Sequence, residues 1–462
     1  MLNLFLAVAI VAWFCLLYGV ARQGLATAAR PPDGPLVVPI VLVAAFAFSQ
    51  LVFVVERQDG QAVLEEGLSA SNLVTIALTG LTALYLTVQA VRDRRLLRVP
   101  LAMPYLPFTL LVAADGLSTL WSVVPAYTAY RTVELGIFTL ATVLIFDRAD
   151  IERRLADILA AFVLLWLAAV APTVVTSLAG GIVFSSAKNN MMPFVCACLG
   201  FLVVFDRRAP RRGLYVALAA VGFVVAGSAS STGALVAVVP GVMIASSSRT
   251  IRGLGIVVTL ATVAAFLVLM LGISMFPDLL DTVSAVLQKT TEELSNGTGR
   301  NSFWPVFLEA TRDRLLGSGF SAGDRFLDVL IARSSPGGVA PTEAHGLASA
   351  HNMFLTAWAG LGLVGLCFTV VVLWGAVRAG LALERPGRRV VVTCVLVLVL
   401  NGMTTPGIFQ DWNVNSLAFV ALLAYARVGA LRRRAEAAWT CAAVRRAPLP
   451  PAPVPTAGWR AA

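Results

Sequence analysis

The chain has 462 residues, of which 58% are hydrophobic and 13% charged, and its formal net charge is +10. Its mean hydropathy of +0.84 excludes an ordinary soluble protein, because one aqueous core could not bury so much apolar side-chain surface. A nucleic-acid partner is not expected either, because the arginines are spread over separate loops instead of gathering on one surface with aromatic residues between them. The composition therefore indicates a membrane protein.

Apolar runs of about 20 residues, the length of an α-helix that crosses a bilayer, recur along the chain. Transmembrane β-strands would show shorter segments of alternating hydrophobicity, so the sequence predicts an all-α fold. The first run lacks the basic start and the clear cleavage site of a signal peptide, and we interpret it as a helix. About 12 to 13 transmembrane helices are expected, in the runs 2–21, 35–55, 68–91, 101–121, 127–146, 155–175, 189–206, 213–229, 231–248, 252–276, 351–378, 389–406 and 412–428.

Basic segments follow every second apolar run, and after residue 90 they lie at 92–98, 147–154, 206–212, 249–252, 377–389 and 432–434. Because basic loops stay in the cytoplasm, this alternation predicts an outer amino terminus, a cytoplasmic tail and one large external loop between the tenth and eleventh spans. The expected parts are an N-terminal transmembrane bundle (1–276), a periplasmic loop with an amphipathic helix (277–350), C-terminal transmembrane helices (351–430) and a disordered, Pro- and Ala-rich tail (431–462).

Polar residues at the outer ends of the spans are candidates for function, because a polar group there either pairs with another protein group or binds a substrate. Arg131 lies just inside the fifth span, in the same region as Asp115 and Glu134. It either forms an arginine–carboxylate pair that ties two helices together or binds an anion. Lys188 and Asn189 begin the seventh span, where a lysine at a helix N-terminus either binds phosphate or extends to the membrane interface.

Two further outer segments carry polar residues. The segment GSASST at 227–232, which includes Ser230, forms a tight turn with hydroxyl caps or hydrogen-bonds to a sugar or phosphate. In the external loop, Asn301 or Ser302 is expected to cap an amphipathic helix that lies along the membrane surface. Arg300 precedes this helix with no carboxylate in the same turn, which favours anion binding.

His351 stands at the start of the eleventh span. Ser349 is a suitable cap for this span, which places His351 and Asn352 in the first helical turn. A helix N-terminus disfavours the imidazolium form, so His351 would stay neutral, as a general base must. The alternative is a histidine at the membrane interface that caps the helix or hydrogen-bonds.

Five short motifs follow one another along the chain: KN at 188–189, SxSST at 228–232, GR(x)3W at 299–304, LLGSGFSAG at 315–323, and HN(x)2L(x)4GL from His351 to Leu361 with Gly365 beyond it. In this order they resemble the O-antigen ligase and polymerase family, from LSTLWSVVPAYTAYR at 117–131 onward. The resemblance implies a bacterial inner-membrane glycosyltransferase with a glycosyltransferase-C type fold. Such an enzyme transfers a glycan from undecaprenyl diphosphate to an acceptor on the outer face, which is lipid A core for ligases and another glycan for polymerases.

The resemblance also implies roles for individual residues. Arg300 resembles the family's loop arginine that grips the diphosphate, and His351 resembles the histidine that takes the proton from the acceptor hydroxyl. Lys188 and Arg131 would add positive charge. The remaining expected substrate-binding residues are Asn189, Ser230, Trp304 and Asn352. Because the sequence has no DxD motif or His/Asp/Glu cluster for a divalent ion, we expect a metal-independent, inverting reaction without a cofactor.

The chain departs from many family members at two places. Ala187 precedes the KN motif where many members have His or Gly, and the outer turn has Ser230, Ser231 and Thr232 where many have an arginine. Either Arg131 supplies the missing charge or the substrate differs. A non-catalytic transporter or flippase is the alternative, but it predicts ionisable residues deep in several spans. Short cytoplasmic loops and the GR(x)3W spacing favour an exopolysaccharide polymerase over a ligase, with membrane lipid and a chain-length regulator as further partners.

Overall fold

The computed structural model describes residues 37–52, 70–148, 150–180, 192–205, 212–228, 238–241, 243–244, 248–272, 311, 313–325, 352–403, 405, 407–408 and 412–446. Every regular element in these ranges is a helix, and none of the described residues forms a strand. The prediction of a helical membrane protein is thereby confirmed. The first predicted span and most of the predicted external loop lie outside the described residues.

The described helices correspond to the apolar runs of the sequence and, apart from the end of the last helix, their ends fall near the predicted ones. For example, α6 begins at Pro125, whose fixed φ suits the first turn of a helix, and ends at Phe146. The α-helices are α2 (Val37–Val52), α4 (Ala70–Arg92), α5 (Leu106–Leu117), α6 (Pro125–Phe146), α7 (Ile151–Gly180), α8 (Met192–Phe205), α9 (Arg212–Ser228), α11 (Arg249–Gly272), α15 (Ala322–Arg325), α17 (Met353–Leu381), α18 (Arg385–Gly402) and α19 (Val414–Arg446). Three short 3-10 helices are η2 (Arg94–Leu97), η3 (Val99–Leu101) and η4 (Ser118–Leu120).

Within the described residues, 4 helices are long and apolar enough to cross a membrane: Asn72–Arg92, Pro125–Phe146, Met353–Leu381 and Val414–Trp439. Three shorter apolar helices accompany them, at Leu106–Leu120, Phe194–Phe205 and Arg212–Val225. These helices support a membrane protein by length and composition. The larger number of spans expected from the sequence stays a prediction.

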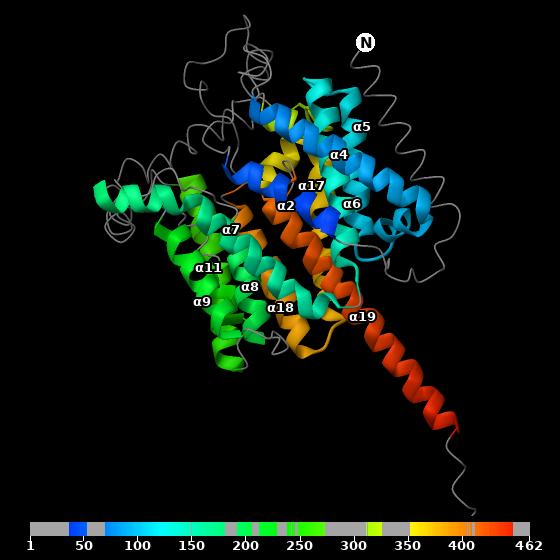
Figure 1. Ribbon diagram of the computed structural model, residues 1–462. Helices are drawn as coiled ribbons and strands as arrows, with labels where there is room; N and C mark the ends of the chain where they lie inside the picture. Colours follow the sequence, from blue (N-terminus) through cyan, green and yellow to red (C-terminus); the bar gives the residue numbers. More distant parts are fainter. Residues whose placement is uncertain are drawn as a thin grey trace, which may run out of the picture.

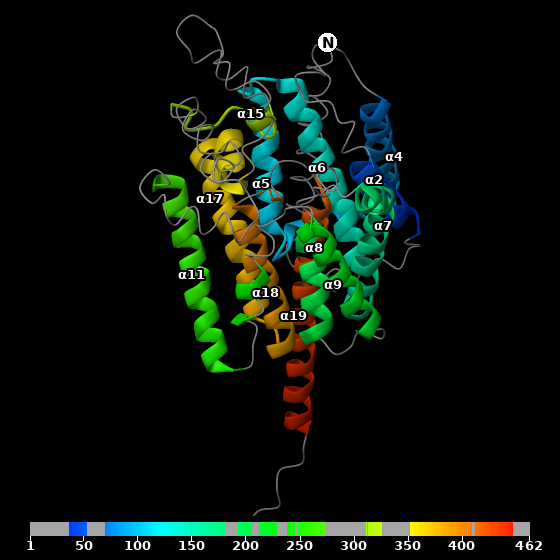
Figure 2. The same ribbon diagram turned by 90° about the vertical axis from the view of Figure 1, so that its left-hand side faces the viewer.

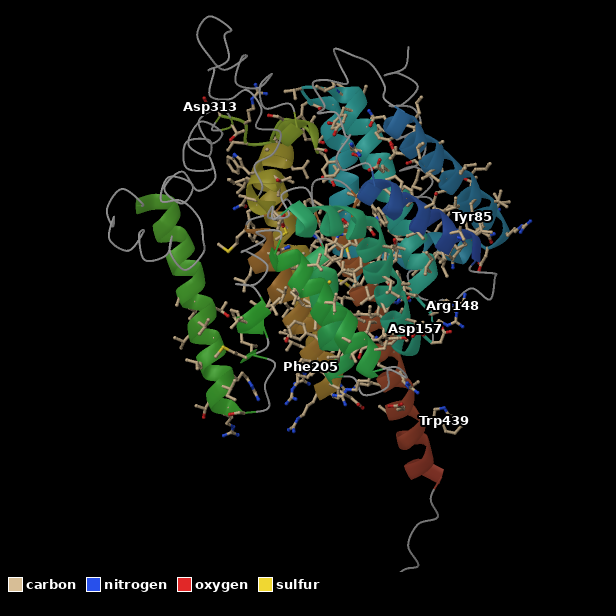
Figure 3. All side chains as sticks on the ribbon, turned by 60° about the vertical axis from the view of Figure 1, so that its left-hand side comes forward. Tyr85, Arg148, Asp157, Phe205, Asp313 and Trp439 are labelled. Carbon is tan, nitrogen blue, oxygen red and sulfur yellow. The ribbon has the colours of Figure 1, made fainter. Side chains whose placement is uncertain are left out.

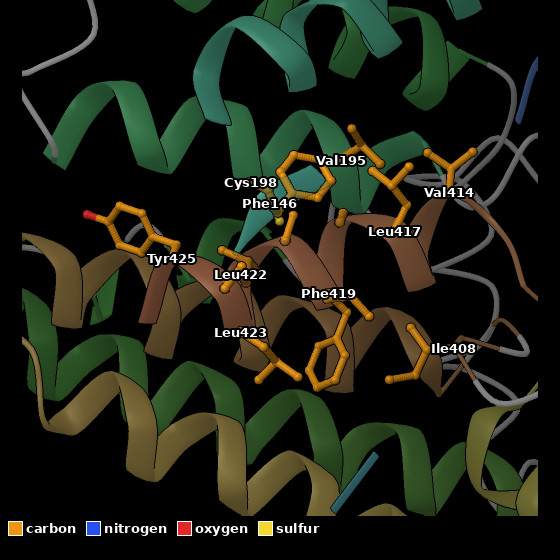
Figure 4. Packing of buried hydrophobic residues seen from close by; sticks show 14 of the residues in the cluster. Phe146, Val195, Cys198, Ile408, Val414, Leu417, Phe419, Leu422, Leu423 and Tyr425 are labelled. Carbon is orange, nitrogen blue, oxygen red and sulfur yellow. The ribbon is translucent and has the colours of Figure 1, made fainter. Parts of the chain in front are cut away.

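The centre of the bundle is formed by α8 and the first half of α19. The side chains of α8 from Phe194 to Leu199 are all buried, as expected of a helix that is apolar on every side. In Figure 4, Leu417 and Leu422 of α19 lie close to Phe146 of α6 and Val195 of α8. Around this core, α2 and α4 pack against α6, and α9 and α18 pack against α8 (Figure 1).

The outer helices carry exposed apolar side chains. On α4, Leu84 and Val91 are exposed, and on α11, which lies at the edge of the bundle in Figure 2, Val257 and Leu260 are exposed. On a water-soluble protein such surfaces would promote aggregation, whereas in a bilayer they contact the hydrocarbon chains of lipids. The exposed apolar surface therefore agrees with the hydropathy of the chain.

Three labelled residues from predicted external and cytoplasmic segments lie toward different ends of the molecule. Asp313, in the predicted external loop, lies at one end in Figure 3, and Arg148 and Trp439, in predicted cytoplasmic segments, lie toward the other. Which end faces outward stays a prediction.

The last helix is longer than the sequence predicts. The predicted tail begins at residue 431, whereas α19 continues to Arg446 and projects from the bundle in Figures 1 and 2. Residues 431–446 are rich in Ala and Arg, which favour helix, and Arg432 pairs with Glu436 one turn later at 3.4 Å. The first proline after this segment is Pro448, so local composition allows the helix to extend well past the predicted end of the span.

Candidate functional site

The first turn of α17 is fixed by Asn352. This residue is the N-cap, and its side-chain oxygen accepts hydrogen bonds from the backbone N–H groups of Phe354 at 2.9 Å and Leu355 at 3.1 Å. Its amide nitrogen also donates to the carbonyl of Met403 at 3.1 Å, which joins the start of α17 to the end of α18. The prediction that Asn352 lies inside the first turn, with Ser349 as cap, is therefore wrong, because Asn352 itself satisfies the free N–H groups.

The helix α17 is broken at Gly362, which has φ 61° and ψ −140°. A segment from the LLGSGFSAG motif docks at this break. Ser318 N–H donates to the carbonyl of Ala359 at 2.7 Å, and Gly319 N–H donates to that of Gly360 at 3.0 Å. In return, the N–H of Leu363 donates to the carbonyl of Leu315 at 2.9 Å. The docked segment, residues 313–325, thus satisfies backbone groups near the break, as a membrane-embedded chain requires.

Glycine is required at two places in this contact. Gly317 has φ 72°, and a Cβ added to it would overlap the backbone of Gly360. A Cβ on Gly362 would overlap the carbonyl of Leu315. The glycines of both motifs therefore allow two backbones to approach closely in conformations that other residues avoid. Their presence is explained by the packing of the docked segment against α17.

The hairpin between α5 and α6 holds the docked segment from the other side. Ser118 Oγ accepts a hydrogen bond from Phe320 N–H at 2.9 Å, and Thr128 Oγ1 donates to the carbonyl of Phe320 at 2.9 Å. The indole N–H of Trp121 donates to the carbonyl of Leu316 at 2.8 Å. Figure 2 shows the result, with α15, α5, α6 and the start of α17 near one end of the molecule.

Arg131 lies on α6 one turn after Thr128 and is 8% exposed. Its Nη1 donates to both carboxylate oxygens of Glu134, at 3.0 and 3.2 Å. The guanidinium carbon also lies 5.1 Å from the ring centroid of Tyr127 and 5.6 Å from that of Tyr130, within cation–π distance. The sequence predicts an arginine–carboxylate pair between two helices as one alternative, but this pair lies within one helix.

Residues 214–370 match the family model described as O-antigen ligase. The resemblance to the O-antigen ligase family is confirmed. The matched residues begin in α9 and include the docked segment, Asn352 and the break at Gly362. No curated protein matches the chain. Together with the apolar helices, the match supports a membrane protein of the O-antigen ligase or polymerase type, and glycosyltransferase activity at the level of the family.

Most of the predicted site residues lie outside the described part of the chain. These residues are His351, Arg300, Trp304, Lys188, Asn189 and Ser230. The two that are described, Arg131 and Asn352, belong to helices whose starts lie at the same end of the molecule (Figure 2). Thr311, from the predicted amphipathic helix, is buried and accepts a hydrogen bond from the indole N–H of Trp358 on α17 at 2.9 Å. This contact connects the predicted external loop to the helix that follows His351.

The sequence alone does not single out Ser118 and Thr128 as the residues that hold the docked segment. Hydroxyl side chains are common in apolar helices because they bond to the carbonyl four residues earlier, as Thr142 does to Phe138 at 2.6 Å. In the sequence, a hydroxyl residue that binds a distant segment cannot be distinguished from one that bonds within its own helix. The position of Ser118 and Thr128 on either side of the WSVVP turn is the one available signal.

The described residues of the ligase-like protein contain no group of three His, Cys, Asp or Glu side chains placed to hold a metal ion. Arg131, a positively charged side chain at this end, already pairs with a carboxylate. Its pairing leaves room for an anion only if Glu134 is displaced or if the anion approaches from the other side of the guanidinium. The tyrosine rings that flank it would keep the guanidinium in place in either case.

Proposed function

We propose that the protein is a bacterial glycosyltransferase that transfers a glycan from undecaprenyl diphosphate to an acceptor hydroxyl on the outer face of the inner membrane. The observation that carries this proposal is the O-antigen ligase match over residues 214–370, because that segment contains both Arg300 and His351. The expected topology, with the segment between 277 and 350 on the outer side, supports the same location for the reaction.

The proposed reaction is a direct displacement. His351 takes the proton of the acceptor hydroxyl, the acceptor oxygen forms a bond to the anomeric carbon, and the bond from that carbon to the diphosphate oxygen breaks. The configuration of the anomeric carbon is inverted, and undecaprenyl diphosphate leaves with the electron pair. Arg300 and Lys188 neutralise the charge that develops on the leaving diphosphate. No cofactor takes part in the proposed scheme.

Two described residues support a role for the outer end of the bundle in this proposal. Arg131 offers a buried guanidinium, and anions bind more tightly where water is excluded. Asn352 fixes the start of α17 by three hydrogen bonds, and the proposed base immediately precedes it in the chain. Trp304, Ser230 and Asn189 complete the proposed substrate-binding residues.

The glycan acceptor distinguishes a polymerase from a ligase. We favour a polymerase of exopolysaccharide, which extends one lipid-linked glycan with another, because of the short cytoplasmic loops and the GR(x)3W spacing. In that case a membrane protein that sets chain length is an expected partner. A ligase would instead deliver a finished glycan to a lipid acceptor.

The test replaces His351 and Arg300 with alanine one at a time in the host. His345→Ala is the matched control for the histidine, because it changes the second histidine of the same predicted loop, and Arg434→Ala is the control for the arginine, because Arg434 is exposed on α19. All four variants should insert into the membrane in normal amount. Surface polysaccharide, separated on gels, should be lost in the first two variants and retained in both controls.

The lipid-linked glycans then identify the step. A lost polymerase leaves single repeat units on undecaprenyl diphosphate, whereas a lost ligase leaves long glycans on the carrier. If His351→Ala and Arg300→Ala both leave the surface polysaccharide unchanged, the proposed site is wrong. If lipid-linked glycan instead accumulates on the cytoplasmic face, the protein is a flippase.

A further inference from the structure

A small cavity lies where α5, the docked segment and α17 meet. Its volume is about 10 Å³, which is close to the smallest space that holds one water molecule. Leu111, Phe320 and Leu361 contribute apolar walls, and Asp115 and Thr356 also line the cavity. Two polar side chains thus line a space of about the size of a single water molecule.

Both polar side chains have an unused oxygen. Asp115 is 1% exposed and Thr356 is 2% exposed, and neither Asp115 Oδ2 nor Thr356 Oγ1 has a hydrogen-bond partner. A buried polar atom without a partner destabilises the folded state, and a buried charge does so more strongly. The fold therefore carries a penalty at this site unless a small polar molecule fills the cavity.

The hydroxyl of Thr356 differs from that of a threonine farther along the same helix. Thr369 Oγ1 donates to the carbonyl of Gly365, four residues earlier, at 2.8 Å, as threonines in helices commonly do. The corresponding carbonyl for Thr356 is that of Asn352, and it accepts the backbone N–H of Thr356 at 2.8 Å, whereas the Thr356 hydroxyl has no partner. The hydroxyl of Thr356 is thus available to a ligand in the cavity.

The number of available oxygens favours water over a metal cation. A cation such as Ca²⁺ takes six or more oxygen ligands, whereas a buried water needs two to four polar partners. The cavity offers the two unused side-chain oxygens, and the nearby carbonyl of Gly360 already accepts the N–H of Gly319 at 3.0 Å. A neutral carboxylic acid at Asp115 would supply the O–H that water accepts, and it would avoid an uncompensated negative charge.

We propose that this cavity is a hydration site in which one water molecule bridges the neutral carboxyl group of Asp115 and the hydroxyl group of Thr356. The water accepts a hydrogen bond from the Asp115 O–H and donates one to Thr356 Oγ1. It joins α5 to α17 within one turn of Gly360, whose carbonyl receives the docked segment. The bridge is independent of the proposed glycosyl transfer, since it involves neither His351 nor Arg300.

Infrared spectroscopy of the purified full-length protein in nanodiscs tests this site without an activity assay. The difference spectrum between the unmodified protein and Asp115→Asn should contain the C=O stretching band of a protonated carboxylic acid at neutral pH. Thr356→Val has nearly the same shape without the hydroxyl, so it should shift this band, because the bridging water loses one anchor. Thr356→Ser keeps the hydroxyl and should leave the band in place.

Thr369→Val is the matched control, because it removes a hydroxyl from the same helix that bonds within the helix. It should leave the band unchanged. Absence of a protonated-acid band from the difference spectrum, or an identical band in Thr356→Val, would overturn the proposal. So would a band that changes when sodium chloride replaces choline chloride, because the occupant would then be a cation. If Asp115→Asn does not fold, exchange of the unmodified protein into ¹⁸O-water replaces it, and the O–H stretch of an internal water must then shift.

Discussion

The protein buries an arginine–carboxylate pair in each half of the bundle, and the two pairs have different connections. In the predicted cytoplasmic half, Arg427 of α19 donates to Asp147 Oδ2 at 3.1 Å, and the hydroxyl of Tyr105 donates to Asp147 Oδ1 at 3.2 Å. These three residues come from three separate parts of the chain. In the predicted outer half, Arg131 and Glu134 are neighbours on one helix.

This difference shows how each end is held together. Burial raises the pKa of the Asp147 carboxyl, and Arg427 and the Tyr105 hydroxyl oppose the rise, so the carboxylate depends on partners from other helices. At the opposite end, neutral hydrogen bonds from Ser118 and Thr128 hold the docked segment. An ion pair therefore joins separate helices at one end, whereas at the other end the Arg131–Glu134 pair lies within one helix and neutral hydrogen bonds hold the docked segment.

The strongest test of this comparison removes Arg427. Arg427→Met leaves the buried carboxylate of Asp147 without its cation, and we expect a loss of about 4 kcal/mol in the free energy of unfolding. The melting temperature in detergent, followed by fluorescence, measures the loss. Arg432→Met, on the exposed part of α19, is the control and should change little. Equal melting temperatures for the two variants would mean that the ion pair does not fasten the helices.

The next largest effect is expected at the break in α17. Gly362→Ala places a Cβ against the carbonyl of Leu315 at a φ that alanine disfavours, and it should cost about 3 kcal/mol. Limited proteolysis should then cleave residues 313–325 more readily, because their docking site is distorted. Gly80→Ala on α4 is the control, since no atom lies within 4 Å of the added Cβ, and it should be neutral or slightly stabilising. Unchanged cleavage in Gly362→Ala would contradict the docking.

A smaller effect is expected for Ser118→Ala. The variant leaves the N–H of Phe320 without its acceptor, which should lower the free energy of unfolding by about 2 kcal/mol. Thr87→Ala is the control, because it removes an exposed hydroxyl that bonds only to the carbonyl of Ala83 in its own helix, α4. The two melting temperatures are compared directly. A Ser118→Ala variant as stable as Thr87→Ala would show that neutral hydrogen bonds do not hold this end.

The smallest loss of stability is expected for the outer pair. Replacing both Arg131 and Glu134 with glutamine removes the two charges within one helix, and the melting temperature should fall by the equivalent of less than about 1 kcal/mol. The amount of surface polysaccharide should nevertheless fall about tenfold, because a charge-assisted hydrogen bond to the diphosphate is lost. A large loss of stability would instead assign the pair a structural role, and unchanged polysaccharide would exclude Arg131 from the site.

Most helices could be located from the sequence because their ends lie close to the ends of the apolar runs. For α6, the predicted run 127–146 differs from the helix Pro125–Phe146 by two residues at the start. The end of α19 could not be placed by hydropathy, because the helix continues through a segment rich in arginine. Hydropathy marks where a helix enters and leaves the membrane, whereas local helix propensity decides where it ends.

Less of the site could be predicted. Residue type identified Arg131 and Asn352 as outer polar residues, but not their partners. Glu134 is one turn from Arg131, and helical spacing favours it over Asp115 as the partner. The docking at Gly362 depends on a positive φ and on hydrogen bonds between residues far apart in the chain, and neither leaves a local pattern. The repeated glycines of LLGSGFSAG indicate a close approach without identifying the segment approached.

The break in α17 also has a consequence for biosynthesis. In the predicted topology, with the chain inserted in order, residues 313–325 are translocated before α17 enters the bilayer. The carbonyls of Ala359 and Gly360 then find partners only if the earlier segment is already on the correct side. A chain with one preceding span inverted would place that segment on the wrong side and leave polar backbone groups of α17 in hydrocarbon. Because of the break, the stability of α17 depends on the correct orientation of the spans inserted before it.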